Sequence, residues 1–276
     1  MRAIRNDSFG IGLRSEHIND IRDEPKYSEL DFLELAPDNW MGIDGLKREF
    51  LEDISQKYSL VAHGLSLSIG DTCPINREYL YQVKHFIERY NIAIYSDHLC
   101  YSRDKQGYLY DLLPVPRYKE NIDYLVARID EVQDILQQII VLENITWYYK
   151  YPNEMPEIDF WVELLDKSKC NMLLDINNVY VNSLNHGYDA YEYIKNIPSD
   201  RISYYHIAGH LKTDDFILDT HGTDVHANVL ALAKDVFLYH GAKPLILERD
   251  NNIPQLDDLL EELRVIKQFV NNLKMS

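Results

Sequence analysis

A short apolar run followed by a segment of helical periodicity recurs eight times along this chain of 276 residues. The runs are rich in aliphatic, β-branched and aromatic residues and show little polar alternation, which is typical of strands buried on both faces of a parallel sheet. They span residues 9–13, 32–35, 59–63, 92–96, 139–143, 171–175, 202–207 and 244–248. Strands that alternate with helices form parallel sheets with crossover connections, and eight of them close a barrel.

The segments that follow the runs carry apolar residues at the 3.6-residue period of a helix. In the third segment, Leu80, Val83 and Ile87 form one apolar stripe that would face a core. The predicted helices span residues 15–27, 46–56, 76–90, 118–138, 158–168, 189–196, 225–239 and 256–273. We therefore predict an α/β fold, a (β/α)8 TIM barrel.

The chain carries no linker, low-complexity tract or sharp change of composition, and α/β barrels commonly fill this length as one unit. We therefore predict a single TIM-barrel domain over residues 1–276. A doubly wound open sheet is the alternative fold. The chain lacks the glycine-rich fingerprint of that fold, because no third glycine follows Gly10 and Gly12 at the required spacing and no GKS or GKT sequence occurs.

Charge, hydropathy and cysteine content narrow the class of protein. The net charge of -17 disfavours nucleic acid as a ligand, although a local basic or metal-rich groove can oppose the global sign. We expect a cytoplasmic protein without a membrane partner, because no apolar run approaches the ~20 residues of a membrane span and the N-terminus lacks a signal segment. Cys73, Cys100 and Cys170 are odd in number and widely spaced, so we expect free thiols.

Metal-competent side chains stand at the C-terminal ends of most of the predicted strands, where TIM barrels place their active sites. One histidine at a strand end is more often a satisfied core residue, and one carboxylate often caps the next helix. Six consecutive strand ends of this kind are improbable by chance, and such groups would repel or desolvate one another without a cation. The candidate metal ligands are His63, His98, Glu143, Asp175, His206, Asp219, His221 and Glu248.

Imidazoles mixed with carboxylates, without thiolates, favour iron, manganese or zinc over magnesium or calcium. Eight ligands are too many for one ion with an open position, and Glu143 or Glu248 can each bridge two ions. We therefore expect two or three metals, with Glu143, Asp175 and Glu248 as catalytic residues. Asn178 is a further candidate ligand whose alternative role is to form a turn, and His210 is either a ligand or a support for one.

Other polar residues lie at the same predicted rim and are candidates for substrate binding. Glu34 and Asn39 follow the second strand, while Arg14 follows the first and has a structural ion pair as its alternative role. Arg249 comes directly after Glu248 and would orient ligands or bind a substrate carboxylate. The candidate substrate-binding residues are thus Arg14, Glu34, Asn39 and Arg249.

Motifs at the strand ends occur in a specific combination that covers nearly the whole chain. They include Gly10-Ile11-Gly12-Leu13-Arg14, His63-Gly64-Leu65-Ser66, Ser96-Asp97-His98-Leu99, Leu142-Glu143-Asn144, Asp175-Ile176-Asn177-Asn178, His206-Ile207-Ala208-Gly209-His210, Asp219-Thr220-His221 and Leu247-Glu248-Arg249-Asp250. This combination resembles the multinuclear non-haem iron-dependent oxidases, the family that includes the iron subunit of methanobactin biosynthesis. The wider superfamily contains the xylose isomerase-like TIM barrels.

The resemblance implies a barrel with two or three irons at the eight candidate ligands and O2 as co-substrate. It also implies that the enzyme modifies cysteines of a ribosomally made precursor peptide, which a small partner protein presents. The alternative is a metal-dependent hydrolase or isomerase similar to xylose isomerase or the three-zinc apurinic endonuclease. In the endonuclease pattern a histidine stands where this chain has Asn178. A non-catalytic metal-binding scaffold is the third hypothesis.

Overall fold

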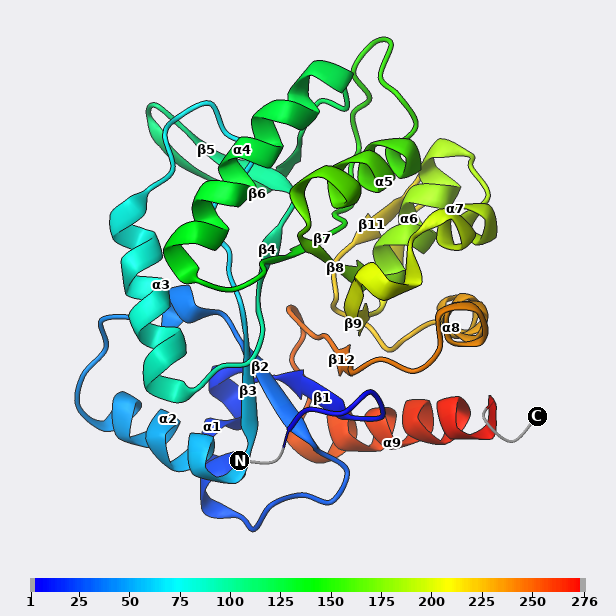
Figure 1. The fold of residues 1–276 in the computed structure, drawn as a ribbon. Coiled ribbons are helices and arrows are strands. Elements are labelled where there is room, and N and C mark those ends of the chain that lie inside the picture. Colours follow the sequence, from blue (N-terminus) through cyan, green and yellow to red (C-terminus); the bar gives the residue numbers. More distant parts are fainter. Residues whose placement is uncertain (1–2, 274–276) are drawn as a thin grey trace.

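Eight parallel strands close a barrel in the computed structural model, which describes residues 3–273 apart from the side chain of Tyr110. The order around the barrel is β1-β12-β9-β8-β7-β4-β3-β2, so each barrel strand pairs with the next one along the chain (Figure 1). This confirms the predicted TIM barrel. Its strands are β1 (Phe9–Gly12), β2 (Phe32–Leu35), β3 (Ser59–His63), β4 (Tyr95–His98), β7 (Val141–Glu143), β8 (Asn171–Asp175), β9 (Ile202–Ile207) and β12 (Leu245–Leu247).

Helices surround the barrel and bury their apolar stripes against it (Figure 1). In α3, Leu80 and Val83 of the predicted stripe are buried, and the Asn76 side chain caps the helix by accepting a hydrogen bond from the backbone N–H of Tyr79. The helices are α1 (Ile18–Asp23), α2 (Leu46–Lys57), α3 (Arg77–Tyr90), α4 (Lys119–Leu136), α5 (Glu157–Ser168), α6 (Ile176–His186), α7 (Ala190–Asn196), α8 (Ala227–His240) and α9 (Leu256–Leu273), with short 3-10 turns at Ser15–His17, Pro37–Asn39 and Ser199–Arg201.

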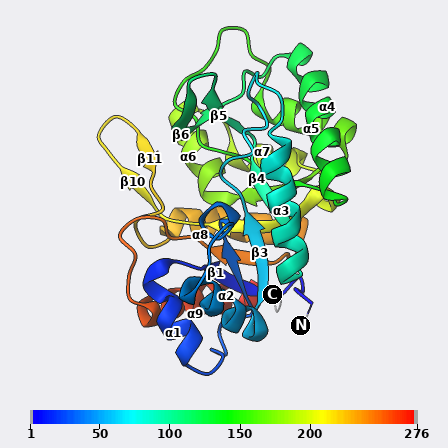
Figure 2. The same ribbon diagram turned by 90° about the vertical axis from the view of Figure 1, so that its left-hand side faces the viewer.

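Two hairpins and one helix go beyond the expected eight units. The hairpin β5 (Cys100–Asp104) with β6 (Gly107–Pro114) follows β4, and the hairpin β10 (His210–Lys212) with β11 (Ile217–Asp219) follows β9. The second hairpin projects from the barrel in Figure 2. Helix α6 begins directly after β8, in a stretch rich in asparagine and β-branched residues that favour helices only weakly. These three elements lie at the end of the barrel where the candidate ligands lie.

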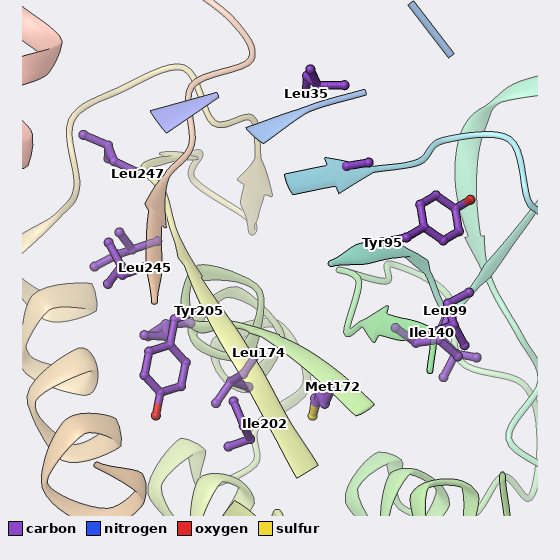
Figure 3. Packing of buried hydrophobic residues seen from close by; sticks show 14 of the residues in the cluster. Leu35, Tyr95, Leu99, Ile140, Met172, Leu174, Ile202, Tyr205, Leu245 and Leu247 are labelled. Atoms are coloured by element: carbon purple, nitrogen blue, oxygen red, sulfur yellow. The ribbon is translucent and has the colours of Figure 1, made fainter. Parts of the chain in front are cut away.

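The core has two layers that follow the alternation of side chains along each strand. The larger cluster fills the space between the strands and the helices, and Figure 3 shows Leu174, Tyr205 and Leu245 within it. A second, smaller cluster comprises Phe32, Val61, Val141, Leu173, Tyr204 and Ile246. Because these residues alternate with those of the larger cluster, they point into the barrel. They form an apolar floor inside it.

None of the described helices is both long and apolar enough to cross a membrane. The three cysteines are free, as expected; Cys73 is half-buried, whereas Cys100 and Cys170 are buried. Burial raises the pKa of Cys170 to about 11 and that of Cys100 well above its ordinary value.

The burial of the thiols predicts the outcome of cysteine labelling. Iodoacetamide at pH 8 should modify Cys73 alone in the folded protein, because only a thiolate reacts and only this side chain is accessible. All three cysteines should react in denaturant. Peptide mass spectrometry identifies the labelled sites, and rapid native labelling of Cys100 or Cys170 would contradict the structure.

Candidate metal centre

A polar ring lies directly above the apolar floor, because the candidate ligands follow the floor residues by two positions. His63 follows Val61 on β3, Glu143 follows Val141 on β7, and the same spacing holds on four other strands. Since residues i and i+2 of a strand share a face, the inward layer changes from apolar to polar at one level of the barrel. The ring produced by this spacing comprises Glu34, His63, Glu143, Asp175, His206 and Glu248.

The first group of ligand atoms comes from His63, His98 and Glu143. The Nε2 atoms of the two histidines lie 3.1 Å apart, and Glu143 Oε2 lies 2.9 Å from the first and 3.1 Å from the second. His98 Nδ1 donates a hydrogen bond to the Gly64 carbonyl at 3.1 Å, which leaves its Nε2 free as a lone-pair donor. Ligands ~2.1 Å from an octahedral ion lie about 3.0 Å from one another. The three atoms therefore fit one metal ion.

The second group consists of Glu143, Asp175, His206 and Glu248, whose ligand atoms all lie within 4.8 Å of one another. His206 Nδ1 lies 2.9 Å from Glu248 Oε2 and 3.6 Å from Glu143 Oε1. Glu143 thus directs Oε2 to the first group and Oε1 to the second. Asp175 caps α6 by accepting the Asn178 N–H with Oδ1, while its Oδ2 is buried without a hydrogen bond.

The third group lies toward the cavity, around His221. Its Nε2 lies 2.7 Å from Asp219 Oδ1, and its Nδ1 lies 3.3 Å from both Glu248 Oε2 and Asp250 Oδ2. Asn178 lines the same cavity; its Oδ1 is buried without a partner while its amide nitrogen donates to the Asn144 carbonyl at 2.9 Å, so the free oxygen is available as a ligand. Asp250 was not among the predicted ligands. Its position two residues after Glu248 continues the inward alternation and is the signal that would have found it.

His210 and Arg249 lie outside these groups. His210 Nδ1 bonds to Asn177 Oδ1 at 2.8 Å, and the Asn177 amide donates to Asp219 Oδ1 at 2.8 Å, so the imidazole reaches the third group only through Asn177. Burial and the nearby His226 lower the pKa of His210 to about 4. Arg249 is buried, binds Glu262 of α9 and does not line the cavity.

A cavity of about 920 Å³ opens above the ring. Arg14, Glu34 and Asn39, three of the four candidate substrate-binding residues, line it. Arg14 forms an ion pair with Asp250 and lies 3.8 Å from Glu248. The rest of the wall mixes polar side chains with aromatic and aliphatic ones, which include Trp40, Leu112, Leu113, Trp147, Tyr148 and Tyr149. Loops, the β5–β6 hairpin and the strand ends all contribute, so the cavity can admit an extended ligand.

Buried like charges and unpartnered atoms are concentrated in the ring. In the ring and at the cavity-lining Asn178 and His221, the buried atoms without a hydrogen bond are Glu143 Oε2, Asp175 Oδ2, Asn178 Oδ1, both nitrogens of His206, His221 Nε2 and Glu248 Oε2. Several of them lie within ion-pair distance of one another but are not aligned as hydrogen bonds. Carboxylate oxygens and imidazole nitrogens that converge in this way, without aligned hydrogen bonds between them, fit a set of bound cations.

The protein without metal must hold protons where cations would otherwise bind. Burial opposes protonation of His63, but the Glu143 carboxylate raises its pKa to about 9. Burial and His63 lower the pKa of His98 to about 4. Burial, together with the nearby Glu143, raises the pKa of Asp175 well above its ordinary value. Metal binding therefore displaces protons from this ring.

The fold and the ring define the class of protein: a (β/α)8 TIM barrel with candidate metal-binding clusters at its C-terminal mouth. A xylose isomerase domain protein from Planctomyces limnophilus aligns with a TM-score of 0.62 and 11% identity over 98% of this chain and 100% of that chain. An L-ribulose 3-epimerase aligns with a TM-score of 0.59 and 12% identity over 97% and 96% of the two chains. Identity this low shows the fold alone.

Residues 8–271 match the family model of the RiPP precursor modification enzymes MbnB/TglH/ChrH, and the chain belongs to this family. RiPP denotes a ribosomally synthesised and post-translationally modified peptide. A UPF0276 protein of Acinetobacter baylyi is 46% identical over 259 residues, which cover 94% of this chain and 89% of that protein. A UPF0276 protein of Shewanella amazonensis is 39% identical over 261 residues, covering 94% and 93%. The family match confirms the resemblance inferred from the strand-end motifs.

Proposed function

We propose that this protein is a multinuclear non-haem iron, O2-dependent oxidase that modifies cysteine residues of a ribosomally made precursor peptide. The observation that carries the proposal is the convergence of His63, His98 and Glu143, two imidazoles and a carboxylate within 3.1 Å of one another. Two histidines and one carboxylate are the ligand set of non-haem iron sites that react with O2. Membership in a family of precursor-modifying enzymes supports a peptide substrate.

In this proposal the ring holds two or three irons. Glu143 joins the first and second groups, Asp175, His206 and Glu248 complete the second, and Asn178, Asp219 and His221 form the third. Bound iron would supply O2 binding and one-electron oxidation at the cysteine. His210 would position Asp219 through Asn177 rather than act as a ligand.

The residues of the cavity suit the binding of an extended peptide. Arg14 and Asn39 lie on its wall, where a guanidinium and an amide can bind peptide carbonyl or carboxylate oxygens. The aromatic side chains of Trp147, Tyr148 and Tyr149 would cover apolar parts of the peptide and exclude water from the ring. Arg249 would act indirectly, by fixing the end of β12 to α9 through Glu262. A small partner protein would present the peptide.

Oxygen uptake tests this function. Protein loaded anaerobically with iron is mixed with a cysteine-bearing precursor peptide, with and without a small partner protein, and O2 consumption and peptide mass are followed together. We expect O2 uptake with a mass change at cysteine, and neither with a Cys→Ser peptide or with zinc in place of iron. No uptake by the iron-loaded protein would reject the oxidase. O2-independent conversion of a sugar with zinc or manganese would favour the isomerase alternative instead.

A further inference from the structure

A chain of polar contacts crosses the barrel and joins three residues of the ring through Ser96 and Tyr204. His63 Nδ1 lies 2.8 Å from Ser96 Oγ, which lies 2.6 Å from the Tyr204 hydroxyl. Tyr204 donates to Glu34 Oε2 at 2.8 Å, and the other Glu34 oxygen lies 2.8 Å from His206 Nε2. The residues come from β3, β4, β9 and β2, and all of them are buried. A single polar path thus links a histidine of the first group to a histidine of the second.

The Glu34 carboxylate sets the direction of this chain. A carboxylate only accepts, so the Tyr204 proton points to Glu34 and the Tyr204 oxygen must accept from Ser96. Ser96 has one proton, and its two acceptors are the Tyr204 oxygen at 2.6 Å and the Ala62 carbonyl at 3.3 Å, so at its contact with His63 it can only accept. His63 therefore carries its proton on Nδ1.

The direction of this chain determines which nitrogen of each imidazole faces the candidate metals. With its proton on Nδ1, His63 has a free lone pair on Nε2. This nitrogen lies beside Glu143 and His98, where the first group would bind a metal ion. At His206 the contact with Glu34 is short but is not aligned as a hydrogen bond, so Glu34 acts there through its charge. Carboxylate oxygens lie beside both nitrogens of His206, so Glu34 favours the proton on Nε2 once a cation held by Glu248 and Glu143 takes the Nδ1 lone pair.

We propose that Glu34 is a positioning residue which, through Tyr204 and Ser96, selects the ring nitrogens that His63 and His206 present to the metals. The inference rests on the proposed metal centre and gives Glu34 a role other than substrate binding. Both of its oxygens already face protein groups, although the residue also lines the cavity. One carboxylate thereby orients ligands in two different groups.

The composition of the apolar floor supports this role. Of its six residues, Tyr204 alone carries a hydroxyl, and the other five are purely hydrocarbon. A phenylalanine at this position would fill the barrel equally well, so packing does not account for the oxygen atom. The oxygen joins Ser96 on β4 to Glu34 on β2, and neither strand is adjacent to β9 in the barrel.

The substitution Tyr204→Phe removes this one oxygen and tests the proposal. In zinc-loaded protein with 15N-labelled histidine, long-range 1H–15N spectra report which nitrogen of each imidazole carries the proton. We expect Nδ1–H on His63 in the wild type and loss of that single form in the variant. Zinc and Fe(II) affinity, measured by competition with a chelator, should fall about 10–100-fold, as is typical when a partner of a metal ligand is lost.

Tyr205→Phe is the matched control. Tyr205 is the next residue on β9, equally buried, and its hydroxyl donates to the Gly241 carbonyl at 3.0 Å on the outer side of the barrel. This variant should keep the wild-type spectra and metal affinity. Glu34→Gln should shift both readouts in the same direction as Tyr204→Phe. If Tyr204→Phe does not fold, Ser96→Ala breaks the same chain one link earlier and is measured in the same way.

The outcomes separate this inference from the proposed function. If wild-type protein binds neither zinc nor iron at the ring, the metal centre itself is wrong. If the wild type binds metal and the Tyr204→Phe protein matches it in both affinity and imidazole spectra, the metal centre stands and the positioning role of Glu34 is overturned. Weaker binding with a changed His63 spectrum, and no change in Tyr205→Phe, supports the role.

Discussion

Glu143→Gln is expected to remove tight metal binding from two groups at once and to lower metal affinity by more than about 100-fold. That figure is the upper end of the loss seen when only a partner of a ligand is removed, and Glu143 directs one oxygen to His63 and His98 and the other to His206. Burial opposes its ionisation, but His98 and His63 hold the pKa of Glu143 well below its usual range. The neutral amide cannot replace this bridging charge.

Glu157→Gln is the control for this prediction. Glu157 is half-buried outside the ring, where it accepts hydrogen bonds from Trp147 Nε1 at 2.9 Å and from the Tyr193 hydroxyl at 3.2 Å. Its variant should bind as much iron as the wild type. The metal content of both variants is measured after gel filtration. Peptide turnover should be lost in Glu143→Gln and retained in Glu157→Gln. Wild-type metal content in Glu143→Gln would refute the assignment of a shared carboxylate.

Removing the metals should lower the melting temperature by on the order of 10 °C, and the difference should widen as pH rises. A ligand at a thousand times its dissociation constant stabilises the folded state by ~4 kcal/mol. For a chain of this size each kcal/mol corresponds to roughly 2–4 °C. The change in melting temperature therefore depends on how tightly the ring binds its metals. Its pH dependence comes from the histidines and Asp175 of the ring.

The sign of the pH dependence follows from the shifted groups. His63 has a pKa of about 9 in the metal-free protein against 6.5 ordinarily, so protonated His63 stabilises the fold fully below pH 6.5 and this stabilisation disappears between pH 6.5 and 9. The shift corresponds to about 3 kcal/mol. The raised pKa of Asp175 acts in the same direction, because its folded form holds a proton that the unfolded chain has released. Bound metal replaces these protons, so its stabilising effect grows over the same range.

Differential scanning calorimetry of metal-free and reloaded protein between pH 6.5 and 9 checks this prediction. The metal-free melting temperature should fall across the range while the loaded protein changes little. His85→Gln serves as the control, because this histidine is exposed on α3, away from the ring, and its variant should follow both wild-type curves. A gap that narrows with pH, or metal-free and loaded proteins that melt together, would contradict a metal site built on these groups.

The barrel was predictable because its signal is local. Each buried strand appears as an apolar run, and each run ends in a polar group such as His63 or Glu143, so the fold and the mouth of the barrel follow from the sequence. The alternation of side chains continues beyond the end of β12. Glu248 and Asp250 face the cavity, and Arg249 between them faces outward to α9. Its exclusion from the cavity could have been inferred from this parity.

Other features depend on closure of the barrel and are not encoded in any one segment. The hydrogen bond from Tyr204 to Glu34 joins residues 170 positions apart, and nothing in either strand indicates that the two side chains meet across the interior. His210 lies shortly after the end of β9, at the first residue of β10, where the sequence suggested a ligand. It is kept from the ring by its bond to Asn177, a residue of the unexpected helix α6. Both the Tyr204–Glu34 hydrogen bond and the position of His210 thus depend on tertiary contacts, which no single segment of the sequence reveals.

The most direct test of the central claim is the iron content of protein purified anaerobically and reconstituted with 57Fe, read by elemental analysis together with Mössbauer spectroscopy. We expect two or three irons per chain, with spectra that show magnetic coupling between the ions that Glu143 would bridge. One isolated iron, or a protein that retains no iron at all, would contradict it.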